Sequence, residues 1–305
     1  MVPLRCKKIG LKFISNETVW AIGSITKTMT AMLVMMLVDE GRVALDDPIG
    51  AHVADLPKKW RKFTVAQLLS HTSGVPGDLD NPCGHAVPSN ASYTLRDMFR
   101  EVTCLPLRDA PGAAFHYADQ NYQMLGLLIE ATSGASYEEA LRRRIFDPLG
   151  MASAGLLDNE TVIEGRADGY ARRGEGYVNA PPMDPAIEFS SGGVVATIGD
   201  LATFVAAVGA RRLLSDESWD AMWSRPPGVE DTPYGFGFGL TPYAGFRRVG
   251  HNGAAVGYAS AFSWFPDLGA GVVVLSNGYQ EPFGRNVQDL AHDIARRAGV
   301  VPSER

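Results

Sequence analysis

The stretch from residue 24 to residue 40 constrains the fold more than any other part of the sequence. Nothing in this stretch breaks a helix, and Gly41 supplies a C-terminal stop. Met, Leu, Val and Ala fill almost every position between Met29 and Val38, so the predicted helix is apolar on nearly every side. Such a helix must be covered by other elements all around. We therefore predict a buried central helix with Ser24 at its N-terminal end.

The chain is long enough to supply the elements that bury this helix. Its 305 residues are 46% hydrophobic and 20% charged, which indicates one large domain or two apposed lobes. The net charge is -6 and the basic residues are scattered, so no nucleic-acid partner is expected. The apolar run from Ala31 to Val38 is too short to span a bilayer, so we expect no membrane partner. The sequence indicates no oligomeric state.

The expected location is cytoplasmic as the sequence stands, because its start lacks the features of a signal peptide. Only 23 residues precede Ser24, however, and a missing N-terminus could have carried an export signal. The cysteines Cys6, Cys83 and Cys104 cannot all pair, and we expect free thiols in a reducing compartment. Cys83 and His85 offer two metal ligands without a matching second pair, so we predict no metal and no cofactor.

The middle of the chain is expected to be mostly helical. Thr64 and Gln67 form a capping box at the start of a short helix. Three further segments carry apolar residues at helical spacing, namely 121–131, 137–145 and 201–208. Residues 172–185 are rich in Gly, Pro and charge, which predicts a linker.

Strands are expected towards the C-terminus. Residues 259–265 and 271–276 are rich in Val, Phe and Trp and flank a turn at 266–269, which predicts a hairpin in a mostly antiparallel sheet. Residues 286–298 predict an amphipathic helix that covers this sheet.

Ser24 and Lys27 form the only Ser-x-x-Lys motif in the chain. In a helix this spacing puts both side chains on one face, so Lys27 can accept the serine proton. For that role the pKa of Lys27 must fall from about 10.4 towards neutrality, which burial favours. The alternative is that Ser24 caps the helix and Lys27 is an exposed residue of its first turn. A four-residue motif alone does not decide between them.

The segments around this motif resemble those of the class C β-lactamase-related serine hydrolases, in the same order along the chain. They are Trp20–Ala31, Leu68–Gly74, Pro111–Gly112, Phe115–Tyr117, Asn121–Gly126, Phe146–Met151, Ser191–Gly193 and His251–Gly253. The resemblance extends from about residue 17 to residue 278. Within the family, the sequence is similar to the esterase and D-aminopeptidase-like branch. It implies that Ser24 is the acylated nucleophile.

The resemblance also assigns the catalytic tyrosine. In that family a tyrosine from a loop between helices faces the Ser-Lys pair and relays the proton, with its pKa lowered by the adjacent ammonium. Tyr117 occupies this place, and the alternative is a core aromatic. A literal Tyr-x-Asn at 177–179 lacks the flanking residues and is rejected. His71, His52 and the tryptophans are assigned to packing.

Asp119 departs from the family pattern, since many relatives carry Asn there. An ionised Asp119 beside Lys27 would raise the lysine pKa and oppose its use as a base. A carboxylate also accepts hydrogen bonds without donating any, so we expect substrate contact and a tilt towards esters over β-lactams or peptides. The alternative is that Asp119 only caps the following helix.

His251, Asn252 and Gly253 stand where β-lactamases and transpeptidases of the superfamily carry Lys-Thr-Gly. The resemblance implies that His251 contacts the nucleophile network or the substrate, and that Gly253 lets the strand approach the acyl group. An imidazole in place of a permanent cation makes efficient β-lactamase action less expected. The backbone N–H groups of Ser24 and Ala254 are the implied oxyanion hole. A turn histidine is the alternative for His251.

These features predict an α/β (α+β) fold of the β-lactamase/transpeptidase-like type, with a mostly antiparallel sheet flanked by helices and an inserted helical lobe. The single unit 1–305 would divide into an α/β lobe at about 1–55 and 186–305 and a helical lobe at about 56–185. We expect an active site in the cleft between the lobes.

The expected partner is a small-molecule acyl substrate, a small ester or a related acyl compound, hydrolysed through an acyl-enzyme. Two alternatives within the hydrolases are a D-amino-acid peptidase or amidase and a weak β-lactamase. An alternative of another class is a non-catalytic binding or assembly protein on the same fold.

Overall fold

The predicted central helix is present in the computed structural model, which describes residues 14–77, 94–174, 176–278 and 286–302. A 3-10 turn, η1 (Gly23–Ile25), leads into α1 (Thr26–Asp39). Every residue of α1 from Thr26 to Leu37 is buried. Ser24 therefore lies in the turn that enters the helix, one step before the α-helix itself begins.

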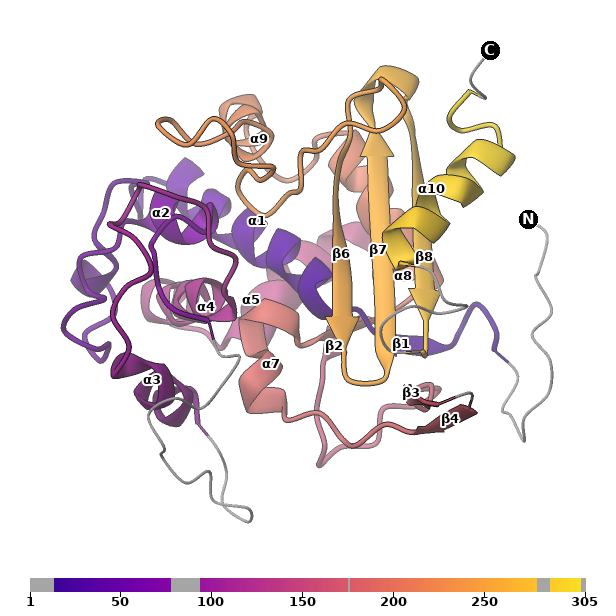
Figure 1. Ribbon diagram of the computed structural model, residues 1–305, viewed down its shortest axis with the longest axis horizontal. Helices are drawn as coiled ribbons and strands as arrows, with labels where there is room; N and C mark the ends of the chain where they lie inside the picture. The colour runs from indigo at the N-terminus through magenta and orange to yellow at the C-terminus, as the bar shows by residue number, and fades with distance from the viewer. Residues whose placement is uncertain (1–13, 78–93, 175, 279–285, 303–305) are drawn as a thin grey trace.

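Helices surround α1 on the side away from the main sheet (Figure 1). They are α2 (Val65–Leu69), α3 (Leu95–Thr103), α4 (Asp119–Ser133), α5 (Tyr137–Leu141), a π-helical turn η3 (Arg142–Phe146), α6 (Asp147–Leu149), α7 (Pro185–Gly192) and α9 (Asp216–Met222), with the 3-10 turn η2 (Ile49–Ala51). The predicted capping box at Thr64 and Gln67 begins α2. Gly134 ends α4 with a φ of 73°. The helices predicted from periodicity are confirmed.

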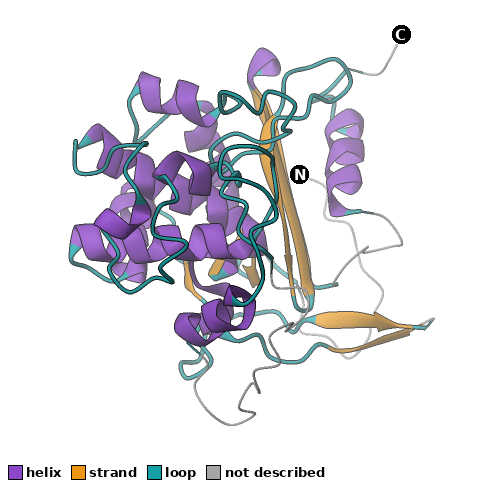
Figure 2. Ribbon diagram, turned by 60° about the vertical axis from the view of Figure 1, so that its left-hand side comes forward, coloured by secondary structure: helices purple, strands orange, loops and turns teal. Residues whose placement is uncertain are grey.

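The main sheet contains three antiparallel strands in the order β6 (Val249–Ala255), β7 (Tyr258–Phe265) and β8 (Ala270–Ser276). The 3-10 turn η4 (Pro266–Leu268) joins β7 to β8, which confirms the predicted hairpin. Figure 2 shows the sheet edge-on, with α10 (Val287–Arg297) on one face and the remaining helices on the other. On that second face, α8 (Ile198–Gly209) contacts β7 and β8. The sequence-predicted arrangement of helices and an antiparallel sheet is thus observed.

A second, smaller sheet joins the start of the chain to its middle. Strand β1 (Val19–Ala21) pairs with β5 (Val194–Thr197), and β5 pairs with β2 (Gly155–Leu156), all antiparallel. The predicted linker at 172–185 is wrong in part, because β3 (Tyr170–Arg173) and β4 (Gly176–Asn179) form a hairpin there. Strands β2, β3 and β4 thus lie within the segment expected to form a helical lobe, and the proposed lobe boundaries stay a prediction.

The expectation of free thiols is wrong for Cys104, which is disulfide-bonded. Cys6, Cys83 and His85 lie outside the described residues. Because disulfides persist in oxidising compartments, the cysteines no longer support the cytoplasmic expectation. Within the described ranges, no helix is both long and apolar enough to cross a membrane.

Candidate active site

The η1 turn and the first turn of α1 bring Ser24 and Lys27 together. Lys27 Nζ donates to Ser24 Oγ at 3.1 Å, as the i, i+3 spacing predicts. The Lys27 side chain is fully buried, whereas Ser24 is partly exposed. The interpretation of Lys27 as an exposed first-turn residue is therefore wrong.

Two glycines allow η1 to lie directly against the edge strand β6. Gly23 has a φ of +53°, and a Cβ at this position would lie 2.7 Å from Ala254 O and 2.9 Å from Ala254 N. A Cβ on Gly253 would lie only 2.0 Å from Ile22 O. The strand therefore lies close to η1 at Gly253, whereas its approach to the acyl group of a substrate stays a prediction. The backbone of Ala254 lies beside the residue that precedes Ser24, and the oxyanion hole stays a prediction that this placement supports.

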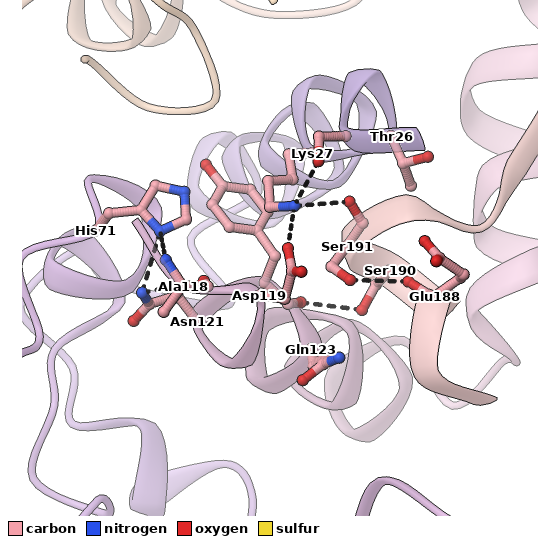
Figure 3. Close-up of polar contacts among 12 residues, drawn as sticks. Thr26, Lys27, His71, Ala118, Asp119, Asn121, Gln123, Glu188, Ser190 and Ser191 are labelled. Carbon is pink, nitrogen blue, oxygen red and sulfur yellow. Dashed lines mark hydrogen bonds and ion pairs between the residues drawn. The ribbon is translucent and has the colours of Figure 1, made fainter. Parts of the chain in front are cut away.

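Lys27 also contacts Asp119 and Ser191, as Figure 3 shows. It forms an ion pair with Asp119, the first residue of α4, and donates to Ser191 O at 2.9 Å. Burial acts to lower the pKa of Lys27, but the charges of Asp119 and Tyr117 and their hydrogen bonds outweigh it and raise the pKa above its ordinary value. The ammonium form of Lys27 is thus favoured. This is the effect that we expect from an ionised Asp119 beside Lys27.

Ser191 enters the site through its backbone carbonyl. Helix α7 is kinked at Phe189, which has a φ of 27° and a ψ of -124°. After this kink the carbonyl of Ser190 accepts from Thr30 Oγ1 at 2.7 Å, and the carbonyl of Ser191 accepts from Lys27. The resemblance identified the segment 191–193. It could not predict the contact of Lys27 with the Ser191 carbonyl, because every residue type has a backbone carbonyl.

Tyr117 lies in the loop just before α4, beside the Ser24–Lys27 pair. Lys27 Nζ lies 4.9 Å from the centroid of its ring, and its hydroxyl interacts with both Lys27 and Ser24. Desolvation raises the pKa of the phenol, against the lowering effect of Lys27, although 44% of the residue is exposed. The expected net lowering is therefore not observed. Tyr177 lies on the exposed hairpin strand β4, in keeping with its rejection.

His71 belongs to the site, which corrects its assignment to packing alone. Its Nδ1 accepts from the backbone N–H of Ala118 at 3.2 Å and lies 3.1 Å from Asn121 Nδ2 (Figure 3). Its ring lies 4.3 Å from the ring of Tyr117, centroid to centroid. Burial lowers the pKa of His71 well below its ordinary value, so the imidazole is neutral. It supports the loop that carries Tyr117. His52 contacts Asp47 instead, away from these residues.

His251 lies on β6, but the protein itself occupies both of its ring nitrogens. Nδ1 lies 2.6 Å from the carbonyl of Asn252, so Nδ1 donates, and Nε2 accepts from the Tyr234 hydroxyl at 2.7 Å. Burial lowers the pKa of His251 to about 3. His251 is a neutral neighbour of Tyr117, with ring centroids 6.3 Å apart, and its direct contact with the nucleophile or substrate stays a prediction.

Tyr234 is a site residue that the sequence reasoning missed. Burial raises its pKa well above the ordinary value, so the phenol keeps the proton that it donates to His251. The following residues are fixed against α1, because Thr28 Oγ1 donates to Gly237 O at 2.8 Å. The alternation Tyr234-Gly-Phe-Gly237 was the available signal, since glycines next to aromatic residues often mark close backbone approach.

A cavity of about 350 Å³ lies near the end of β6. Its lining includes Ala21, Asn179, Met183 and Val256, and it does not include Ser24, Lys27, Tyr117 or His251. The catalytic candidates therefore lie outside this cavity.

The sequence matches the family model described as Beta-lactamase over residues 13–296. It is 31% identical over 287 residues to penicillin-binding protein 4 of Amycolatopsis lactamdurans, which covers 87% of this chain and 74% of the relative. It is 26% identical over 270 residues to the "Putative penicillin-binding protein PbpX" of Bacillus subtilis (strain 168), covering 88% of this chain and 64% of the relative. The chain thus spans about two thirds to three quarters of the length of these curated relatives.

Solved structures show the same fold. A D-stereospecific amidohydrolase from Streptomyces sp. superimposes with a TM-score of 0.78 at 25% identity, over 93% of this chain and 88% of that chain. The predicted β-lactamase/transpeptidase-like fold is confirmed.

Proposed function

This chain belongs to the Beta-lactamase family, and on this basis we propose that it is a serine hydrolase that forms an acyl-enzyme on Ser24. The observation that carries the proposal is the contact of buried Lys27 with Ser24 Oγ, with Tyr117 beside both. A nucleophile with a proton acceptor in hydrogen-bond reach is the arrangement that covalent catalysis requires.

In the proposed reaction, Ser24 Oγ attacks the carbonyl carbon of the substrate, and the bond from that carbon to the leaving group breaks. The serine proton passes through Lys27 and Tyr117 to the leaving group. Water then attacks the acyl-enzyme, returns a proton to Ser24 through the same two residues and releases the acid. The N–H groups of Ser24 and Ala254 would stabilise the oxyanion in both steps.

The ammonium form of Lys27 sets a condition on this scheme. The active fraction of the enzyme is the one in which Lys27 has given its proton to solvent, because an ammonium cannot accept the serine proton. The Asp119 carboxylate makes that fraction small at neutral pH. We therefore expect slow turnover of simple substrates, with a rate that rises towards alkaline pH.

The test is a burst experiment with a chromogenic acetate ester. Wild-type protein should release a burst of about one equivalent of chromophore, and a fluorophosphonate should label the peptide that contains Ser24. Ser24→Ala should abolish both, whereas Ser133→Ala, at the far end of α4, should change neither. A label on another residue, or a burst that survives Ser24→Ala, would contradict the proposal.

The proposed leading substrate is a small ester or related acyl compound. Amide hydrolysis is a second candidate, because the superimposed Streptomyces protein is a D-stereospecific amidohydrolase. Comparing matched esters and amides of one acyl group separates the two. If Asp119 favours esters, Asp119→Asn should lower the ester-to-amide ratio of kcat/KM, and an unchanged ratio would remove that argument.

A further inference from the structure

The cavity near the end of β6 is large enough for a small molecule. Its volume is about 350 Å³, and binding sites for small molecules measure about 300–1,000 Å³. Figures 1 and 2 show the β3–β4 hairpin at the end of the main sheet where β6 turns into β7. The cavity lies in this region, because its lining combines Ala21 of β1, Asn179 of β4 and Val256 from the turn after β6.

Two loop segments form walls of the cavity, residues 166–169 and 179–183. In the first segment, Ala167 N donates to Val19 O of β1 at 3.0 Å, and the Tyr258 hydroxyl of β7 donates to Ala167 O. Ala180 N in the second segment donates to Gly169 O in the first at 2.9 Å. The walls are thus attached to β1, to β7 and to each other. The cavity is therefore preformed and is not a gap between loose loops.

The Arg166 side chain is half-buried in the wall of the cavity. Within the part of the chain that the structure describes, no hydrogen bond or ion pair uses its guanidinium. The guanidinium charge acts to lower the pKa of the Tyr258 phenol, although burial raises this pKa overall, so the cation lies near that hydroxyl. A guanidinium carries five N–H donors in a planar fork that matches a carboxylate. Arg166 can therefore hold an anion in the cavity.

Asp168 limits the charge of that anion. It follows Arg166 by two residues in an extended segment, and both residues line the cavity. Asp168 is exposed whereas Arg166 is half-buried, and the described ranges contain no ion pair between the two. The carboxylate thus lies towards solvent and leaves the guanidinium available. It would repel a phosphate monoester, with a charge of about -1.5 to -2, more strongly than a ligand with a single negative charge.

The rest of the lining suits a molecule that is partly apolar. Asn159 donates to Met183 O at 2.6 Å through Nδ2, which leaves its Oδ1 as an acceptor for a ligand. Apolar residues supply much of the remaining lining, namely Ala21, Leu157, Pro181, Pro182, Met183 and Val256. A carboxylate at Arg166 would place an attached hydrocarbon group against these side chains, where burial of apolar area stabilises the complex.

We propose that this cavity binds a small monocarboxylate with an apolar body, and that Arg166 holds the carboxylate. The inference goes beyond the proposed hydrolysis and does not depend on Ser24 being the nucleophile. The carboxylate has two possible sources, a separate ligand or the distal end of a long substrate. Val256 follows Ala254 by two residues, about 7 Å along a strand, so either source is compatible with the position of the cavity.

The binding test is calorimetric titration with 4-phenylbutanoate, with 4-phenylbutanamide as its neutral analogue and acetate as the acid without the apolar body. Wild-type protein should bind 4-phenylbutanoate at least about tenfold more tightly than either, as a hydrogen-bonded charge pair and apolar burial each require. Arg166→Gln should raise the Kd of 4-phenylbutanoate at least about tenfold. The matched control is Arg173→Gln, at the exposed end of β3, which should retain the wild-type Kd.

The wild-type comparison needs no folded variant. Equal affinity for 4-phenylbutanoate and 4-phenylbutanamide, or no binding of 4-phenylbutanoate at millimolar concentration, would overturn the inference. So would an unchanged Kd in Arg166→Gln, because the acid would then lie elsewhere, for example at Ser24. Absence of Ser24-dependent hydrolysis would remove the proposed function and leave these binding results intact.

Kinetics distinguish the two sources of the carboxylate. The second wall segment ends just before α7, whose Ser191 carbonyl contacts Lys27. A separate ligand should therefore change kcat for the chromogenic acetate ester, and Arg166→Gln should abolish this effect of 4-phenylbutanoate. If the carboxylate belongs to the substrate, kcat/KM for monomethyl suberate should instead exceed that for dimethyl suberate at least about tenfold, and Arg166→Gln should remove the preference.

Discussion

Lys27 is subject to two opposing effects. Burial disfavours its charge, whereas the charges and hydrogen bonds of Asp119 and Tyr117 favour it, and the second effect is stronger. The hydrogen bond to Ser191 O also requires a donor, which both protonation states of an amine supply. Asp119 is therefore the residue through which the basicity of Lys27 can be changed without touching the nucleophile.

The first prediction concerns the pH profile of Asp119→Asn. Removing the carboxylate removes the main attraction that raises the pKa of Lys27, so the lysine loses its proton at lower pH. For a neutral ester, the rise of kcat/KM with pH should move to lower pH by at least one unit. The groups that face Lys27 and remain are Tyr117, His71 and His251. Stopped-flow or pH-stat kinetics from pH 6 to 10 would measure the shift, and an unmoved profile would show that another group limits the rate.

The second prediction concerns Tyr234, which donates to His251 Nε2. Tyr234→Phe leaves a buried acceptor without its donor, which costs about 1–3 kcal/mol of unfolding free energy. Because the imidazole then loses its fixed orientation next to Tyr117, kcat should fall about tenfold with KM little changed. Urea unfolding and ester kinetics would measure the two effects.

Tyr177→Phe is the matched control, since this tyrosine is 51% exposed on the hairpin strand β4. It should change neither stability nor kcat. Wild-type kcat in Tyr234→Phe would show that the contact with His251 has no part in catalysis.

At the scale of single residues, the site residues that belong to sequence motifs were predictable. Those that act only through their position in the fold were not. Ser24, Lys27, Tyr117 and Asp119 were identifiable because side chains at fixed spacing carry their chemistry. Ser191 acts through its carbonyl, and His71 reaches the site only through the fold of the loop before α4. Neither property is visible in residue types.

At the scale of elements, the contact between η1 and β6 determines the geometry of the nucleophile. The third prediction is that Gly253→Ala disrupts this contact, because the new Cβ would lie 2.0 Å from Ile22 O and 2.4 Å from Ser260 Oγ. We expect about 1–3 kcal/mol of destabilisation from overpacking. Activity should fall at least a hundredfold, because a displaced β6 carries Ala254 away from Ser24.

Gly155→Ala is the control for this variant. Gly155 also lies in a strand, and a Cβ there meets nothing within 4 Å. It should retain wild-type stability and activity. An active Gly253→Ala enzyme would show that the oxyanion hole is not built from Ala254.

The helices were predictable because their caps and periodicity are local, as the box at Thr64 and the stop at Gly134 show. The β3–β4 hairpin was not predictable, because Gly174 and Gly176 and the charged residues around them have low strand propensity and favour a linker. The kink at Phe189 was not predictable, since a positive φ at a bulky residue is imposed by tertiary contacts.

At the scale of the whole molecule, the site combines segments that are distant in the sequence. Residues 23–27, 117–119 and 251–254 meet only because α1 is enclosed and β6 lies against its entry. Catalysis and global stability should therefore be lost together when buried groups of the site are forced to ionise. His71 and His251 are such groups, with 0% and 5% exposure.

The fourth prediction is an acid-induced loss of stability that begins near pH 6.5. The folded-state pKa of His251 is lowered to about 3, and that of His71 is also lowered, so the unfolded chain binds protons first as the pH falls. Their stabilising contribution is complete above pH 6.5 and declines below it. One pH unit below that value, each histidine lowers the free energy of unfolding by about 1.4 kcal/mol, or about 3 kcal/mol for the pair.

Urea unfolding at pH 7.5 and 5.5 would measure this loss of stability. Because His251→Gln and His251→Asn cannot titrate at that position, both should reduce it by about 1.4 kcal/mol. A full wild-type pH dependence in both variants would mean that His251 is not held neutral in the folded protein.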